Sequence, residues 1–160
     1  MTQPFTLTGA SVNPAEGLYE YVPNLPQQHN AIFYSGTSTD KAHAGQVMAL
    51  NTSSTNTLAP SVVACATTDV APFGIVVYDA RVQEYAVGDK LALAKEGDVI
   101  YMVAGGTIAV GDVVTFNAST RKVTKGAGST TTIGTAITAG ATNDLVQIAI
   151  KFDEYITPST

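Results

Sequence analysis

The chain has 160 residues, of which 45% are apolar and only 13% are charged, and its 8 Lys and Arg against 13 Asp and Glu give a net charge of −5. This length suits one domain with a sizeable core, and few, scattered basic residues argue against a nucleic-acid-binding face. No apolar run approaches the ~20 residues of a membrane span, and the start lacks the basic and apolar regions of a signal peptide. We therefore expect neither nucleic acid nor a membrane among the partners.

Residues 1–40 predict an extended N-terminal arm that docks on a partner. Proline at this density blocks long helices and central strands, whereas the aromatic residues gain by being buried. The alternative is that this segment forms the first edge strand and loops of the same domain. The prolines are Pro4, Pro14, Pro23 and Pro26. The candidate partner-binding residues are Phe5, Leu7, Tyr19, Tyr21, Phe33 and Tyr34.

From about residue 44, short apolar stretches alternate with turn residues roughly every 8 to 12 positions, which is typical of an all-β domain. We predict a single β-domain over residues 41–160, either a small β-barrel or a jelly-roll-like sandwich, with little helix. The best candidate for a short helical turn is Thr39 to His43, where Thr39 or Asp40 could act as the cap. The predicted strands are 45–50, 62–66, 73–79, 90–94, 98–104, 113–117, 121–125, 132–138 and 145–152.

Two of these strands differ in their patterns. Residues 145–152 place Val146, Ile148 and Ile150 on one parity, and period-two alternation indicates one buried and one solvated face. Residues 99–103 are apolar on both parities. We predict that they are buried on both sides, either within the domain or at an interface.

A Gly-Asp turn that leads into an apolar strand recurs along the chain and defines an internal repeat, about 44–93 and 110–152. Glycine accepts a positive φ without a Cβ clash, and we expect the aspartate to bond backbone amides a residue or two further on. A calcium site would need roughly six or more oxygen ligands at one point, which these separated aspartates do not offer. The predicted structural turn residues are Gly45, Gly88, Asp89, Gly111, Asp112 and Asp144.

The sequence carries no constellation of catalytic or metal-binding residues. His29, His43 and Cys65 are too few for most zinc sites, and the zinc-protease, nucleophile-elbow, dinucleotide and P-loop motifs do not occur. Cys65 has no partner for an internal disulfide, and we expect it to be a small buried hydrophobe. We predict no catalytic residues, no metal and no cofactor, and therefore no enzyme.

The stretch from Tyr85 to Phe152 resembles the head-decoration, or structural cement, proteins of tailed bacteriophages. Residues 44–80 fit this family more loosely, and residues 1–40 do not contribute. The segments that carry the resemblance are Pro72–Gly74, Tyr85–Leu93, Gly97–Val99, Ile108–Phe116, Lys122–Lys125, Ile133–Ala136 and Leu145–Ile148.

The resemblance implies a small β-barrel or jelly-roll-like module that binds where capsomers meet on the outside of the head and stabilises the shell. Its partners would be the major capsid protein and copies of itself, with a trimer favoured and a dimer as the alternative. It would be made in the host bacterial cytoplasm and reside on the outer capsid surface. The alternative function is a phage fibre, tail or surface module that recognises a host glycan or protein.

Overall fold

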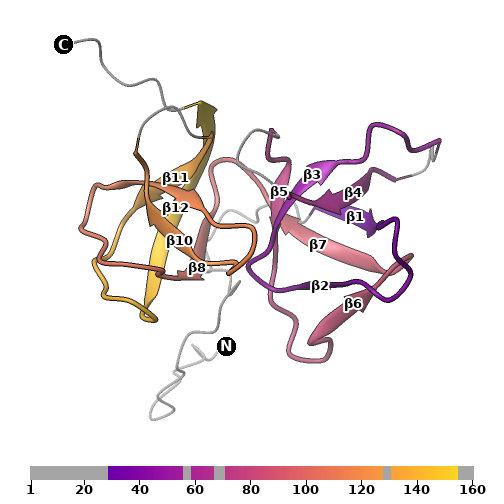
Figure 1. Ribbon diagram of the computed structural model, residues 1–160, viewed down its shortest axis with the longest axis horizontal. Helices are drawn as coiled ribbons and strands as arrows, with labels where there is room; N and C mark the ends of the chain where they lie inside the picture. The colour runs from indigo at the N-terminus through magenta and orange to yellow at the C-terminus, as the bar shows by residue number, and fades with distance from the viewer. Residues whose placement is uncertain (1–28, 56–58, 67–70, 128–130, 155–160) are drawn as a thin grey trace, which may run out of the picture.

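The computed structural model describes residues 29–55, 59–66, 71–127 and 131–154. These residues form twelve β-strands and no helix, arranged as two lobes that lie side by side (Figure 1). The prediction of an all-β fold is confirmed, and of its two architectures the structure has the barrel, since one sheet closes on itself.

The first lobe, residues 29–94, is a closed five-stranded barrel with strand order β1-β4-β3-β5-β7. The parallel pair of β1 and β4 closes the barrel, and the other neighbours are antiparallel. A small antiparallel ribbon of β2 and β6 lies beside it. The bounds are β1 His29–Phe33, β2 Lys41–His43, β3 Val47–Leu50, β4 Ser61–Ala64, β5 Gly74–Val76, β6 Glu84–Ala86 and β7 Lys90–Ala94.

The second lobe, residues 99–154, is a five-stranded sheet with strand order β10-β9-β11-β12-β8. A single parallel bridge from Ala104 to Val123 brings its two edges together. The bounds are β8 Val99–Val103, β9 Val113–Phe116, β10 Val123–Lys125, β11 Thr131–Ala136 and β12 Leu145–Glu154.

The two lobes have the same strand connectivity. The order β4-β3-β5-β7-β1 in the first lobe corresponds, strand for strand, to the order β10-β9-β11-β12-β8 in the second. Equivalent backbone bonds also recur: the Gly45 amide donates to the Val76 carbonyl at 2.9 Å, and the Gly111 amide donates to the Ala136 carbonyl at 2.8 Å. The five-stranded sheet of each unit includes one strand ahead of the predicted repeat, β1 in the first lobe and β8 in the second.

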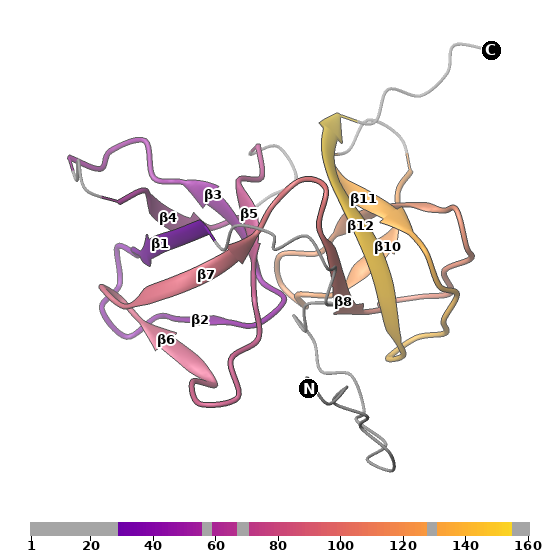
Figure 2. The same cartoon turned by 180° about the vertical axis from the view of Figure 1, so that it is seen from behind.

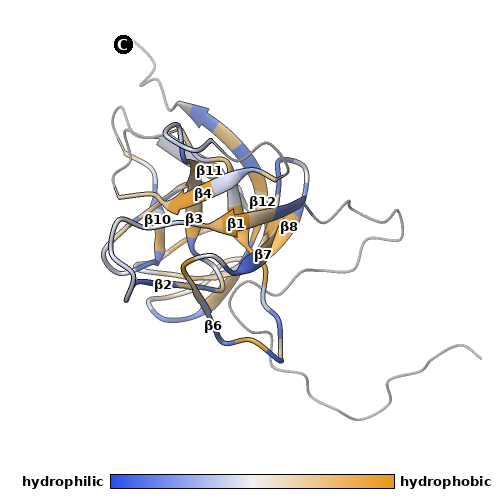
Figure 3. Ribbon diagram, turned by 90° about the vertical axis from the view of Figure 1, so that its right-hand side faces the viewer, coloured by the Kyte–Doolittle hydropathy of each residue, from blue (hydrophilic) through white to orange (hydrophobic). Residues whose placement is uncertain are grey.

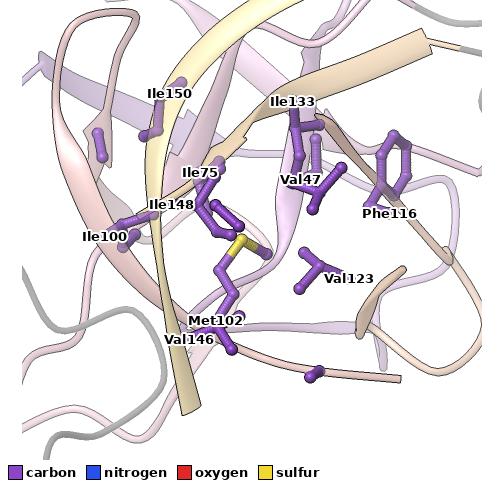
Figure 4. Close-up of a cluster of buried hydrophobic side chains, with 14 of the residues drawn as sticks. Val47, Ile75, Ile100, Met102, Phe116, Val123, Ile133, Val146, Ile148 and Ile150 are labelled. Carbon is purple, nitrogen blue, oxygen red and sulfur yellow. The ribbon is translucent and has the colours of Figure 1, made fainter. Parts of the chain in front are cut away.

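Two hydrophobic clusters fill the molecule. One lies inside the barrel of the first lobe and consists of Ala31, Phe33, Ala42, Met48, Val62, Val76, Tyr85, Leu91 and Leu93. The other fills the second lobe and also includes the outward-facing side chains of β3 and β5, so it joins the two lobes. Figure 4 shows Val47 and Ile75 of the first lobe among Met102, Ile133 and Ile148 of the second.

Residues 29–40 do not belong to an arm, which corrects the predicted boundary at residue 40. His29–Phe33 is a strand between β4 and β7 of the closed barrel, because its alternating Ala31 and Phe33 fill the barrel interior. The predicted helical turn at residues 39–43 is also wrong. Lys41–His43 pairs with Glu84–Ala86 as β2, and this cross-strand pairing overrides the weak local capping signal.

The strand at residues 99–103 is buried on one face only. Ile100 and Met102 are fully buried, whereas Val99, Tyr101 and Val103 are half-buried. The prediction that this strand is buried on both sides within the domain is therefore wrong. In Figure 3, β12 alternates between apolar and polar residues, whereas β8 is mostly apolar.

The shared core predicts a coupled loss of stability. Replacing the fully buried Ile75 by Ala should lower the free energy of unfolding by about 2–5 kcal/mol, because it removes buried contacts and leaves a cavity between the lobes. The matched control Leu50→Ala, at a position 47% exposed, should cost less than about 1 kcal/mol. Urea unfolding followed by near-UV circular dichroism measures both. Two separate transitions, with only one shifted by Ile75→Ala, would contradict a shared core.

Candidate functional site

The predicted Gly-Asp turns share one geometry. The third residue has a positive φ, 94° at Gly88 and 87° at Gly111. The carboxylate of the fourth residue then accepts a hydrogen bond from the amide of the first, at 2.7 Å for Asp89 and 2.9 Å for Asp112. The expected direction of this bond is corrected, because the amide lies three residues before the aspartate rather than after it.

The same turn occurs at three further places. Asp144 accepts from Ala141 at 2.8 Å, and here Asn143 rather than glycine has the positive φ, 74°. Asp98 accepts from Lys95 at 2.7 Å in the turn between the lobes. At residues 43–46 the side-chain oxygen of Gln46 takes the place of the carboxylate and accepts a hydrogen bond from the His43 backbone amide at 3.1 Å. These aspartates are occupied by backbone amides, so each supports the entry of the next strand.

Two lysines of β10 and its turn brace neighbouring turns. The Lys125 ammonium forms an ion pair with Asp112 at 2.6 Å, and the Lys122 ammonium donates to the side-chain oxygen of Asn143 at 2.6 Å. The Lys125 hydrogen bond, followed by the Ala109 amide, holds the pKa of Asp112 below its usual value. Lys122 and Lys125 therefore both form contacts within the fold.

The predicted partner-binding residues separate into three groups. Phe5, Leu7, Tyr19 and Tyr21 lie outside the described residues. Phe33 is 2% exposed inside the barrel, so its assignment as a partner contact is corrected to a core residue. The Tyr34 side chain, one residue later, is 47% exposed.

Tyr34 lies between two surface hollows. The larger, about 460 Å³, is bounded by the first lobe and by Ala118 and Ser119 of the second, and a smaller one of about 310 Å³ shares Tyr34. Ala64 on β4 also lines the larger hollow. It pairs with Met48 of β3 in a non-hydrogen-bonded pair, so the amide and carbonyl of Ala64 point away from β3. The hollow thus places an exposed aromatic ring beside the end of β4.

Among the residues that the structure describes, the titratable groups with shifted pKa values lie apart from one another or in turns. In the part of the chain that the structure describes, no three His, Cys, Asp or Glu side chains are placed to hold a metal ion. Burial raises the pKa of Cys65 to about 12, so its thiol stays protonated and is a poor nucleophile. Burial lowers the pKa of Lys95 to about 8, and its ammonium bonds the Phe73 carbonyl at 2.5 Å beside the Phe73 ring. No described residue belongs to a helix capable of spanning a membrane.

The ion pair between Asp112 and Lys125 predicts a stability that depends on pH. Because the folded-state pKa is lowered, the carboxylate stabilises the fold above its unfolded pKa of about 3.9 and this contribution is lost as the pH falls through the folded value. Asp112→Asn should therefore reduce stability at pH 7 and approach wild type in acid. Urea unfolding across pH measures this difference, and Lys125→Met should reproduce most of it. A difference that stays constant with pH would exclude the charge as its cause.

The comparisons with known proteins agree with this geometry. Residues 27–152 match the family model of phage cement proteins, a range that includes both lobes. A solved structure of similar fold is the head fiber N base of bacteriophage phi29, with 18% sequence identity, a TM-score of 0.54, and coverage of 81% of this chain and 98% of that one. A comparison with curated proteins gives no match. The resemblance found in the sequence is confirmed, and the chain belongs to the phage cement protein family.

Proposed function

We propose that this protein binds the outer surface of a tailed-phage head at capsomer junctions and stabilises the shell. The observation that carries the proposal is the family match across both lobes, since a cement protein is a structural component of the phage head. The mechanism is non-catalytic, with the major capsid protein as its partner. Synthesis takes place in the host bacterial cytoplasm, and the protein acts on the virion.

The shape of the molecule supports this role. A common core joins the two lobes, so a contact made by one lobe also constrains the position of the other. A body that touches several capsid subunits gains avidity without strong individual contacts. Association among copies adds to this effect, with a trimer suited to three-fold sites and a dimer to two-fold sites.

The N-terminal segment is our candidate strap to the capsid. It joins the body at His29, which pairs with Leu93 near the end of β7. The 28 residues before it span up to about 90 to 100 Å when extended. They contain aromatic residues for burial, among them Phe5 and Tyr19, and only two charged residues, Glu16 and Glu20. The hollow beside Tyr34 offers a second contact for an extended segment of the capsid protein.

A fibre, tail or surface module is the second candidate, favoured by the structural likeness to a phage head fiber base. Copy number separates the two functions. A cement protein should be present in hundreds of copies on each particle, because it occupies equivalent junctions over the whole head. A receptor-binding module should be present in a few copies at a vertex or tail. Gel densitometry against the major capsid protein measures this ratio, and a handful of copies would contradict the cement role.

The strap predicts a loss of capsid affinity on truncation. Deleting residues 2–22 should weaken binding to undecorated capsids at least tenfold, since each buried aromatic anchor contributes on the order of 1 kcal/mol or more. Tyr34→Ala should weaken binding through the hollow, whereas Leu50→Ala, whose side chain is equally exposed at 47%, should not. Co-sedimentation with capsids measures all three. Unchanged affinity after the deletion would remove the N-terminal segment from the mechanism.

A further inference from the structure

The outer wall of the second lobe is a sheet face whose central row carries no charged residue. We define this wall as Val99, Tyr101, Val113, Thr135, Ile137 and Ala149. The register places Val113, Thr135, Ala149 and Val99 in one row across β9, β11, β12 and β8. Figure 2 shows β12 crossing this side of the lobe with β8 beside it.

The equivalent wall of the first lobe is covered by this chain itself. Backbone pairings equate Val47 with Val113 and Ile75 with Thr135. Val47 and Ile75 are 4% and 0% exposed, because they pack against the core of the second lobe. The fold therefore shows that a wall in this position accommodates another lobe of the same architecture.

The wall of the second lobe has no such cover among the described residues. Ile137 is 43% exposed, whereas the equivalent Val77 of the first lobe is 6% exposed. Val99, Tyr101 and Val113 are half-buried. The Tyr101 hydroxyl accepts a hydrogen bond at 2.8 Å from the side-chain amide of Gln147, its cross-strand partner on this face.

The charge of the wall is compatible with a second copy as its partner. Each copy carries a net charge of −5, and two copies repel one another least where the contact surface itself carries no charge. The nearest charges along β12 are Lys151 and Asp153, and these form an ion pair with each other at 2.5 Å. We propose that this wall is the surface through which the protein binds a second copy of itself.

The size of the wall fits the centre of such an interface. Four strands about 4.8 Å apart make a face roughly 15 Å across. That is the scale of an apolar interface core, which a polar rim extends to the standard area of about 800 Å² on each partner. This inference names the surface for the self-association in the proposed function and does not depend on capsid attachment.

The test is the self-association of the full chain carrying a charge on the wall. Thr135 is exposed, so Thr135→Glu should fold normally while weakening self-association on the order of 100-fold, the effect of burying one uncompensated charge. Thr135→Val should associate at least as tightly as wild type. Leu50→Glu places the same charge on an exposed strand residue of the first lobe and is the matched control. Sedimentation velocity over a range of concentrations gives the dissociation constants, and thermal unfolding checks the fold.

Two results would overturn the inference. One is a wild-type protein that remains monomeric at every concentration, and the other is a folded Thr135→Glu that associates as tightly as wild type. Co-sedimentation with undecorated capsids keeps this outcome separate from the proposed function. If wild type self-associates through the wall yet does not bind capsids, the capsid role fails and the wall assignment stands. If wild type is monomeric and Thr135→Glu loses capsid binding, the wall belongs to the capsid contact instead.

Discussion

The packing of the first lobe's outer wall against the core of the second lobe is the constraint on which the molecule depends. Val47 and Ile75 lie on strands whose other face lines the barrel, so β3 and β5 are buried on both sides. Fully burying an aliphatic side chain of this size contributes roughly 1.5–3 kcal/mol. Several such side chains at one junction make separation of the lobes costly, because it would expose the core of the second lobe to water.

This junction also explains why two units of the same connectivity are closed differently. In the first lobe, β1 and β4 pair at two positions and seal the barrel around its own side chains. Among the described residues of the second lobe, the equivalent edges are bridged only at Ala104 and Val123. Side chains of the first lobe complete the core there, so the second lobe does not need to close completely. The unequal closure of the two units leaves one wall covered and, among the described residues, the other uncovered.

The sequence predicts the fold best where turn chemistry and strand periodicity act together. The all-β class follows from the regular spacing of turns, and β12 follows from its alternation of Val146, Ile148 and Ile150 with polar or small residues. Three short or irregular features were beyond this reasoning. β2 and β6 have three residues each and exist only because they pair with one another. β1 was hidden in a segment rich in proline and aromatic residues, although its alternation of Ala31 and Phe33 carries the signal of a half-buried strand.

The candidate site was harder to predict, for a physical reason. A catalytic centre is marked by residue types, whereas a docking surface is marked by which side chains a fold leaves outside. Phe33 and Tyr34 are adjacent aromatic residues, and only the position of β1 in the barrel decides that the first is core and the second is exposed. The turn at Gly45 was predicted, but the role of Gln46 was not, because its amide oxygen accepts the bond that aspartate accepts elsewhere.

The use of charge in this protein is consistent with a structural role. Asp89, Asp98, Asp112 and Asp144 each bond the backbone of their own turn, and Lys95 bonds the Phe73 carbonyl. These groups, which an enzyme would use in chemistry, here fix the paths of strands. The residues that define the outer wall of the second lobe are, by contrast, all uncharged. Such a surface recognises a partner by shape and exclusion of water, which suits repeated binding to identical sites on a large shell.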